Sequence, residues 1–321
     1  MTPLKKLTTL AFGTAIALGT TLVGTTASST AAPTWAPAAS AAITPGVQMY
    51  TDGAQCTANF VFTDASDNVY VGYAAHCAGL GEATDTDGCL NESVPLGTTV
   101  TFNKAGSLIS SGTQVGTGTL VYSSWRTMRA NGETDANTCA YNDFALVKVS
   151  NGDKGKVNPS IPFWGGPTGI DTDGTAAGDR VWSYGNSSLR FGLTPLSPKT
   201  GISLGDTAGT DGWTHPLYTV TPGVPGDSGS AFVSADGLAI GTLSTLGLAP
   251  LPLSNNIGDL AKELSYAQAN SGIAGLTLAL GTEPFAPIIW SADATSRPFG
   301  SSEAPSAPAG GVPRFMGALR G

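Results

Sequence analysis

Three residues of the chain have the side chains that nucleophilic catalysis by a serine requires. Ser228 lies in the stretch PGDSGSAF, His76 in GYAAHCAG and Asp143 in YNDFALVKVS. A free serine hydroxyl is a weak nucleophile, and a histidine base that is oriented by a carboxylate activates it. The three residues therefore form a candidate set for acyl transfer, provided that the fold brings them together.

Each of these residues also has a plainer interpretation. Ser228 is flanked by glycine and acidic residues ahead of an apolar run, which is typical of a turn before a buried strand. A lone histidine is more often structural than catalytic, and Asp143 fits the first position of the alternating strand ALVKV. The other histidine, His215, precedes Pro216 in a turn-like stretch, and we expect it at the surface or in a structural role.

The composition favours an all-β protein with many turns. The 321 residues include 43 Gly and 21 Pro, and hydrophobic residues make up 41% of the chain, which is enough for a core. Charged residues make up only 12%, about half of the usual share. The formal net charge is −8, and Lys and Arg form no cluster, which argues against nucleic acid or an anionic membrane as a partner.

The N-terminus has the three regions of a secretory signal peptide. Two lysines precede the uncharged, largely apolar run LTTLAFGTAIALGTTLVG, and small residues follow it. A membrane anchor is the less favoured alternative, because the run is short and rich in Thr. Cleavage after Ala27 or Ala31 fits the small residues, and a later site near Ala41 stays open. We expect residues 1–31 to be the signal peptide and the mature protein to be secreted, with no membrane partner.

Four cysteines, an even number, are expected to form two disulfides in an oxidising compartment. They are Cys56, Cys77, Cys89 and Cys139, and three pairings are open at this point. A zinc site would need close ligand pairs such as C-x-x-C, and none is present. We therefore expect no metal ion, and nothing in the sequence implies an organic cofactor.

Short apolar and β-branched runs alternate with turn signals from about residue 46. Runs of this length and spacing indicate a sandwich or a barrel. The sequence SADG, between Val233 and Leu238, predicts a hairpin turn. One helix is expected in NNIGDLAKELSYAQANSG, capped by Asn256 and ended by Gly272.

The composition also suggests where the folded domain begins and ends. An Ala- and Pro-rich stretch follows the signal peptide, and a stretch rich in Pro, Ser, Ala and Gly without a period closes the chain. We expect a flexible leader over residues 32–45, a folded domain over 46–280 and a disordered tail over 281–321.

The motifs AAHC, DFAL and GDSGS occur in this order and resemble the pattern of the trypsin and chymotrypsin family of secreted serine endopeptidases, in its bacterial branch. The likeness covers roughly residues 46–280. It implies two packed six-stranded antiparallel β-barrels with a C-terminal helix, and a site in the cleft between the barrels. It also implies a polypeptide substrate, and we expect a monomer. An α/β-hydrolase is excluded, because there the nucleophile comes first and lies in G-x-S-x-G.

The resemblance assigns roles to residues of this chain. Ser228 would be the nucleophile, His76 the general base and Asp143 the acid that orients the histidine. The backbone N–H groups of Gly226 and Ser228 would form the oxyanion hole.

The resemblance also implies a disulfide between Cys56 and Cys77. This leaves Cys89 and Cys139 for the second disulfide, a pairing that the resemblance does not itself predict.

In the family, the acid at the position of Asp227 is buried in an ion pair. The resemblance therefore implies that Asp227 also needs a cationic partner from elsewhere in the chain. In animal members the partner is a new N-terminus released by cleavage. The sequence ITPG at Ile43 lies too close to Cys56 to supply it. We expect a cation from the body of the domain instead, with Arg180 as the candidate.

Residues that the resemblance places at the substrate predict a preference for apolar side chains. The position six before the nucleophile is Pro222 rather than an acid, so cleavage after Lys or Arg is not expected. The stretch GTLSTLG resembles the strand that pairs with the substrate, with Ser244, Thr245 and Leu246 lining it. Two alternatives to an endopeptidase stay open, which are a catalytically silent binding protein on the same fold and an exported esterase.

Overall fold

The computed structural model describes residues 33–81, 86–247 and 253–287, together with two short strands near the C-terminus, β16 (Arg314–Phe315) and β17 (Ala318–Arg320). The expected signal peptide, residues 1–31, lies outside the described residues, as does most of the expected tail. In the part of the chain that is described, no helix is long and apolar enough to cross a membrane.

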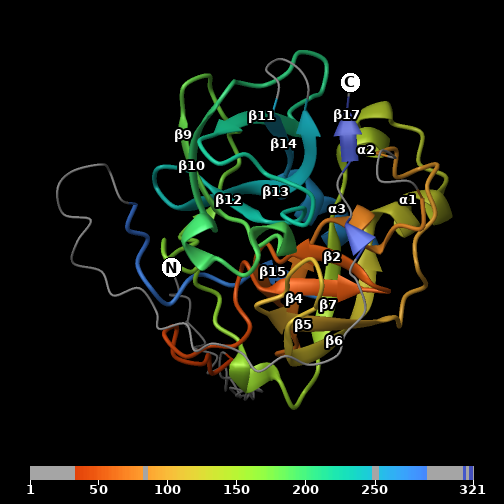
Figure 1. Ribbon diagram of the computed structural model, residues 1–321. Coiled ribbons are helices and arrows are strands. Elements are labelled where there is room, and N and C mark those ends of the chain that lie inside the picture. The colour runs from red at the N-terminus through yellow and green to blue at the C-terminus, as the bar shows by residue number, and fades with distance from the viewer. Residues whose placement is uncertain (1–32, 82–85, 248–252, 288–313, 316–317, 321) are drawn as a thin grey trace, which may run out of the picture. The chain divides into compact units, whose positions relative to one another are not determined.

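The first barrel is built from the N-terminal half of the described chain, drawn in orange and yellow in Figure 1. Its sheet has the order β3-β4-β7-β6-β5-β1-β2. Both ends of this order come from one stretch, because only residues 58–60 separate β2 from β3, and Gly72 of β4 exchanges hydrogen bonds with Asn59 and Phe60. The sheet therefore closes into a six-stranded barrel, in which β2 and β3 together count as one continuous strand. Its strands are β1 (Gln48–Thr51), β2 (Ala54–Thr57), β3 (Val61–Thr63), β4 (Val69–Tyr73), β5 (Thr99–Lys104), β6 (Thr113–Ser123) and β7 (Ala145–Val149).

The second barrel follows in sequence and is drawn in green to cyan (Figure 1). Its order is β12-β9-β10-β11-β14-β13, and an additional pairing of β12 with β13 closes it. The strands are β9 (Arg180–Tyr184), β10 (Pro198–Ser203), β11 (Thr214–Thr219), β12 (Ala231–Val233), β13 (Leu238–Gly247) and β14 (Ser254–Asp259). The predicted all-β fold, with two six-stranded antiparallel barrels and a C-terminal helix, is confirmed.

Shorter elements complete the described chain. The strand β15 (Thr277–Leu278) pairs with β3, β16 pairs with β2, and both β8 (Gly169–Ile170) and β17 run parallel to β13. The α-helices are α1 (Ser124–Asn131), α2 (Ala136–Tyr141) and α3 (Leu260–Asn270), and the 3-10 turns are η1 (Ala75–Ala78), η2 (Lys154–Lys156), η3 (Ser188–Arg190) and η4 (Thr194–Leu196).

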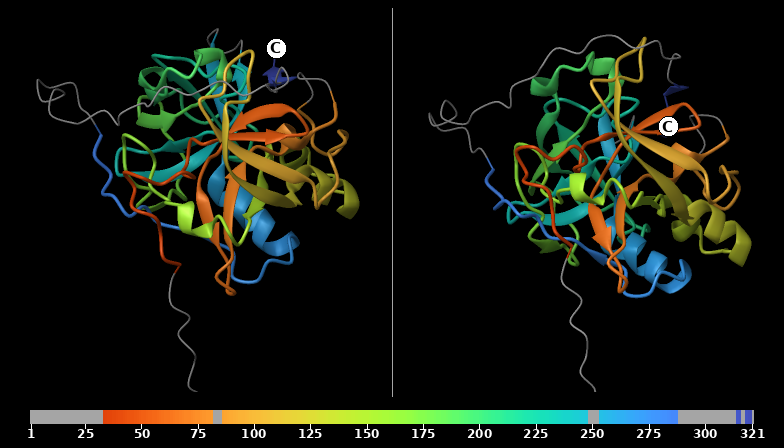
Figure 2. Two further views of the ribbon diagram at one scale, coloured as in Figure 1. Left: turned by 60° about the horizontal axis from the view of Figure 1, so that its bottom comes forward. Right: turned by 90° about the horizontal axis from the view of Figure 1, so that it is seen from below.

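Alternation along β7 shows how the core is divided. Ala145 and Val147 face the interior of the first barrel, whereas Phe144 and Leu146 face a second cluster. This second cluster also contains Leu264 of α3 and side chains of the second barrel, and Figure 2 shows α3 against the orange strands of the first barrel. Since successive strand residues point to opposite faces, one strand serves both clusters. The second cluster thereby joins the two barrels and α3, and a third cluster of apolar side chains fills the second barrel.

The predicted start of the C-terminal helix and its predicted capping residue are corrected, and the predicted hairpin is confirmed. The helix begins at Leu260, not near Asn256, and the Asp259 side chain caps it by accepting the Lys262 N–H at 2.8 Å. Asn256 lies in β14, because this stretch pairs with β11 on one side and β13 on the other. The hairpin between β12 and β13 is present, and its turn needs a glycine because Gly237 has a φ of +77°.

Residues 33–45, expected to be a flexible leader, pack on the first barrel instead. Ile43 is fully buried and bridges to Val157, and the Ala36 N–H donates to the Val157 carbonyl at 2.9 Å. The start of the expected tail is also ordered, since the Phe285 ring contacts Trp182 at a centroid distance of 5.7 Å. Composition missed both segments because a few apolar anchors, spaced irregularly, suffice to fix a loop.

Candidate active site

Asp143 precedes β7 and its backbone is held on both sides by one serine. Ser124, the first residue of α1, accepts the Phe144 N–H through its hydroxyl and donates its hydroxyl to the Asn142 carbonyl at 2.7 Å. The Ser124 N–H also donates to the Phe144 carbonyl at 2.8 Å. The position of Asp143 is therefore set by α1 as well as by β7.

The Asp143 carboxylate accepts three hydrogen bonds. Its Oδ2 lies 2.6 Å from His76 Nδ1 and 2.6 Å from the Ser244 hydroxyl, and its Oδ1 accepts the His76 N–H at 2.8 Å. The residue is buried. Burial alone would raise the pKa of Asp143, but the charge and hydrogen bonds of His76, with the bond from Ser244, outweigh burial and lower it. The group is therefore an ionised carboxylate that orients the imidazole.

His76 lies in η1, where its backbone is fixed by several contacts. The disulfide Cys56–Cys77 joins the next residue to β2, and the Ala75 N–H donates to the Asp143 carbonyl at 3.1 Å. The imidazole is buried, and with Nδ1 on Asp143 its Nε2 has no hydrogen-bond partner among the described residues. The histidine is thus held in one orientation, with the second ring nitrogen available for a proton.

Ser228 lies in a tight loop before β12 that touches both other segments. Its carbonyl accepts the Thr57 N–H at 2.8 Å, and the next N–H, of Gly229, donates to the Leu243 carbonyl at 2.7 Å, one residue before Ser244. A Cβ added at Gly229 would lie 3.0 Å from the Ala74 nitrogen, two residues before His76. The structure therefore brings the loops of Ser228, His76 and Asp143 together.

Gly226, which is expected to contribute to an oxyanion hole, has a backbone conformation that favours glycine. Its φ is +93°, and a side chain there would collide with the Gln55 amide. Its carbonyl accepts hydrogen bonds from Gln55 Nε2 at 3.0 Å and from the Thr57 hydroxyl at 2.7 Å. The Gly226 N–H donates to no described residue. Side chains of the first barrel therefore hold the carbonyl of Gly226 and, with it, the backbone directly before Ser228.

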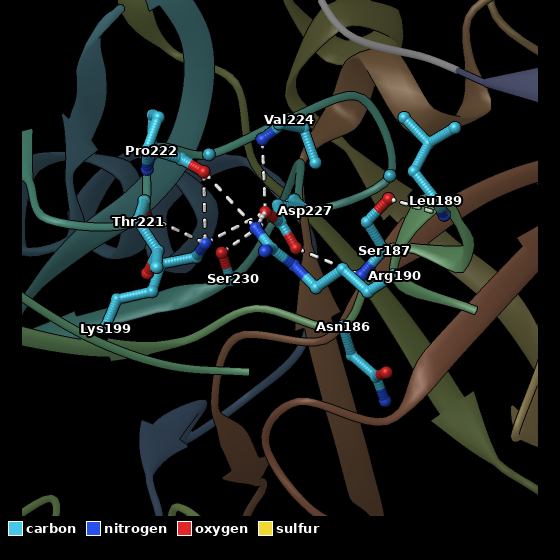
Figure 3. Close-up of polar contacts among 12 residues, drawn as sticks. Asn186, Ser187, Leu189, Arg190, Lys199, Thr221, Pro222, Val224, Asp227 and Ser230 are labelled. Atoms are coloured by element: carbon cyan, nitrogen blue, oxygen red, sulfur yellow. Dashed lines mark hydrogen bonds and ion pairs between the residues drawn. The ribbon is translucent and has the colours of Figure 1, made fainter. Parts of the chain in front are cut away.

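Asp227 is fully buried and bound by two cations (Figure 3). Its Oδ2 lies 2.6 Å from Arg190 Nη2 and 3.1 Å from Lys199 Nζ. Its Oδ1 accepts the Ser187 N–H at 3.0 Å. Burial acts to raise the pKa of Asp227, but the charges of Lys199 and Arg190 outweigh it and lower the pKa.

The expectation that Arg180 pairs with Asp227 was wrong. Arg180 is the exposed first residue of β9, whereas the two partners come from η3 and β10. Lys199 is a better candidate than Arg180, because it lies in the strand PKTGIS and is buried there. A buried lysine is found almost only with a charged partner. Sequence spacing cannot reveal this pairing, because Arg190 lies 37 residues before Asp227.

The residues predicted to contact a substrate have definite places near this loop. The Pro222 carbonyl accepts hydrogen bonds from Arg190 at 3.2 Å and from Lys199 at 3.3 Å, so the same cations fix Pro222 and Asp227. Ser244 is committed to Asp143, as described above. Thr245 is buried, and its hydroxyl accepts a hydrogen bond from Asn256 Nδ2 at 3.0 Å.

Leu246 is half-buried and lies opposite Asn255 in the pairing of β13 with β14. Asn255 was missed by the sequence analysis. Its Oδ1 accepts the Gly223 N–H at 2.8 Å, and a Cβ at Gly223 would lie 2.8 Å from its Nδ2. The segment after Pro222 is therefore tied to β14 by a side chain that no motif marked.

The side chain of His215 binds two aspartates that belong to neither the Asp143 group nor the Asp227 group. It is fully buried in β11, with Nδ1 2.6 Å from Asp206 Oδ1 and Nε2 2.9 Å from Asp259 Oδ2. Burial acts to lower the pKa of His215, but the hydrogen bonds and charges of the two aspartates outweigh it and raise the pKa. The expected structural role fits this geometry, but the expected surface position and turn do not.

The four cysteines form the disulfides Cys56–Cys77 and Cys89–Cys139. The two clusters of described residues with a spacing suited to a metal ion each include both sulfurs of one disulfide. Disulfide sulfurs are not thiolate ligands, so neither cluster offers the donors of a metal centre.

No family model matches the chain, and no curated protein matches it. Solved structures similar to this chain are bacterial serine proteases of the trypsin and chymotrypsin type. Protease A of Thermobifida fusca is 16% identical with a TM-score of 0.45, and the match covers 75% of this chain and 100% of that chain. The Nocardiopsis protease is 17% identical with a TM-score of 0.43, with coverage of 74% and 98%. The chymotrypsin of Cellulomonas bogoriensis is 15% identical with a TM-score of 0.42, with coverage of 74% and 98%. At these values the similarity carries no information on the activity of this chain.

Proposed function

We propose that the protein is a secreted serine endopeptidase that hydrolyses peptide bonds through Ser228, His76 and Asp143. The observation that carries this proposal is the buried Asp143 carboxylate, which binds both Nδ1 and the backbone N–H of His76. A histidine held in this way presents Nε2 to a hydroxyl and keeps one tautomer. A turn serine with no catalytic role needs no such histidine.

In the proposed reaction, Ser228 Oγ attacks the carbonyl carbon of the scissile peptide bond. His76 Nε2 takes the hydroxyl proton as the bond forms and then gives it to the leaving amine. Asp143 stabilises the imidazolium that exists between these two transfers. Water enters next, His76 takes a proton from it, and the acyl-enzyme is hydrolysed, which returns the proton to Ser228.

The oxyanion of the tetrahedral intermediates would be stabilised by the N–H groups of Gly226 and Ser228. The positive φ of Gly226 and the two hydrogen bonds to its carbonyl support this role, because they fix the loop before a substrate arrives. One preorganised donor of this kind contributes about 3 kcal/mol to transition-state stabilisation.

The substrate is proposed to be a polypeptide with a small or medium apolar side chain at the cleaved position. Pro222, Thr245 and Leu246 would form this part of the site, and Ser244 would contribute backbone groups because its hydroxyl is bound to Asp143. Pro222 has no acidic side chain that could anchor Lys or Arg, and its carbonyl already accepts hydrogen bonds from two cations. Secretion is part of the proposal and is supported by the signal-like N-terminus and two disulfides. The proposal also takes the protein to be a monomer.

The test is the intact mass of the purified protein before and after a fluorophosphonate probe. The wild type should gain one adduct, which Ser228→Ala and His76→Ala should lack. The control Ser230→Ala removes the other hydroxyl of the same loop and should keep the adduct. A folded, disulfide-bonded wild type without an adduct would overturn the proposal and favour a silent binding protein.

A second measurement separates a peptidase from an esterase. Matched peptide amides and esters with the same apolar side chain would be compared as substrates. An endopeptidase cleaves both, because the oxyanion hole and the proton transfer to the leaving amine are in place. Hydrolysis of the ester alone would refute the peptidase and leave the exported esterase.

A further inference from the structure

A buried glutamate lies directly behind Asp143 and has no part in the reaction described above. Glu263 belongs to α3 and its side chain is fully buried. Its Oε1 accepts the Asp143 N–H at 3.2 Å. Its Oε2 is also buried and has no hydrogen-bond partner among the described residues. Burying an ionised carboxylate is costly unless it is paired and hydrogen-bonded, and a carboxyl group without such partners becomes neutral instead.

The other backbone contacts of Asp143 show why this bond matters. The carbonyl of Asp143 accepts the Ala75 N–H, and the flanking residues are bonded to Ser124. The Asp143 N–H, by contrast, is bound by a side chain of α3. Glu263 therefore links the C-terminal helix to the carboxylate that orients His76.

We propose that Glu263 is a positioning residue for Asp143. Glu263 accepts the Asp143 N–H and thereby holds the Asp143 carboxylate against His76. This inference rests on the proposed function for its effect on rate, but the placement of Asp143 can be measured without turnover. Glu263 itself would touch neither the substrate nor the reacting atoms.

The neutral form of Glu263 suits this position. Burial, and next the charge of Asp143, raise the pKa of Glu263 well above its usual value, and Asp259 at the start of α3 adds to the effect. Tyr122 on β6 is a further titratable group near Glu263, and its pKa is raised by burial first and then by electrostatic interaction with Tyr266 and Glu263. A neutral acid accepts the N–H through its carbonyl oxygen without placing a second negative charge beside Asp143.

The space around Glu263 supports a fixed side chain. A Cβ added at Gly258 would collide with Glu263 Oε1 and would lie 3.2 Å from the Tyr141 carbonyl. The glycine of β14 therefore leaves room for the carboxyl group between the second barrel and α2. Any larger residue at this position of β14 would displace Glu263 from Asp143.

The variants Glu263→Gln and Glu263→Leu separate the acceptor from the volume. Gln keeps an uncharged carbonyl oxygen at the same reach, whereas Leu leaves the Asp143 N–H buried without an acceptor. The matched control is Leu264→Ala on the same helix. It opens a cavity in the apolar cluster that contains residues of both barrels. All three variants would be compared with wild type for their unfolding midpoint in urea.

The first readout is the low-field proton resonance of His76 Nδ1–H, which reports the 2.6 Å bond to Asp143. The resonance should have the same chemical shift in wild type, Glu263→Gln and Leu264→Ala. It should be shifted or lost in Glu263→Leu. The second readout is hydrolysis of an apolar peptide. Glu263→Leu should lower kcat about 10- to 100-fold, with KM within about threefold, and Glu263→Gln should restore most of kcat.

Three outcomes would overturn the proposal. These are an unchanged Nδ1–H resonance in Glu263→Leu, the same loss in Leu264→Ala, and a Gln variant as impaired as the Leu variant. If wild type shows the resonance but neither hydrolysis nor an adduct, the proposed function fails, and the resonance in the variants still decides the role of Glu263.

Discussion

Replacing Asp227 with Asn should destabilise the protein far more than removing one of its cations. The wild type holds one carboxylate and two cations, and the side chains of Asp227 and Lys199 are fully buried while Arg190 is 11% exposed. The variant Asp227→Asn leaves both cations without a counter-charge, and an unpaired buried charge costs about 3–5 kcal/mol. By contrast, Lys199→Met leaves the Arg190–Asp227 pair intact and loses hydrogen bonds worth about 1–2 kcal/mol.

The assay is urea unfolding at pH 7 with the disulfides intact, using the unfolding midpoint at constant slope. The expected order of stability is wild type, Lys199→Met and then Asp227→Asn. Both variants should also react more slowly with the fluorophosphonate probe, because Asp227 precedes Ser228 in the loop. A Lys199→Met variant that is as unstable as Asp227→Asn would refute the charge balance described here. It would mean that Lys199 is as important for stability as the carboxylate.

Three further predictions follow from hydrogen bonds of named groups. Ser244→Ala removes a 2.6 Å bond to Asp143 and should lower kcat about tenfold, which steady-state kinetics would measure; an unchanged kcat would contradict the assigned contact. His215→Gln should lose more stability at pH 6 than at pH 9, because the raised pKa of His215 gives stability that is full below the unfolded value and is lost as pH rises through the folded value; equal urea midpoint differences at both pH values would exclude a charged histidine. Asp64 has a pKa of about 2, where burial raises the pKa and hydrogen bonds from Asn68 and Tyr70 outweigh it, so the stability lost in Asp64→Asn should shrink as pH falls from 5 to 2; a difference that stays constant in urea titrations would refute this origin.

The three candidate catalytic residues could be predicted because each lies in a short contiguous motif. Composition and strand patterns predicted an all-β protein, and the resemblance carried by the motifs implied the two barrels. Strand alternation around Asp143 and the turn signals before Leu238 are local patterns. Such patterns can be recognised without knowing which distant residues the segment will contact. The pairing of Asp143 with Glu263 joins residues 120 positions apart, and no periodicity marks it. Buried polar partners of this kind follow from packing and not from propensity, so the sequence could not reveal them.

The start of the C-terminal helix illustrates the same limit. The apolar spacing of Ile257, Leu260 and Leu264 fits a helix, but Ile257 lies in the core of the second barrel. Pairing with β11 and β13 extends β14 to Asp259, so the strand takes the residues that propensity alone assigns to the helix. The choice of Arg180 failed for a related reason, since an exposed strand end and a buried loop cation look alike in composition.

The loop that carries Ser228 is built into the second barrel, yet its backbone is anchored by side chains of the first. Gln55 and Thr57 reach the Gly226 carbonyl across 171 and 169 residues of chain. Contacts of such long range require most of the intervening chain to be closed, and the entropy of that closure is lost before the contacts can stabilise the loop. A nascent or half-folded molecule therefore lacks the ordered loop, so the proposed protease would be harmless to its own cell until the whole domain has assembled.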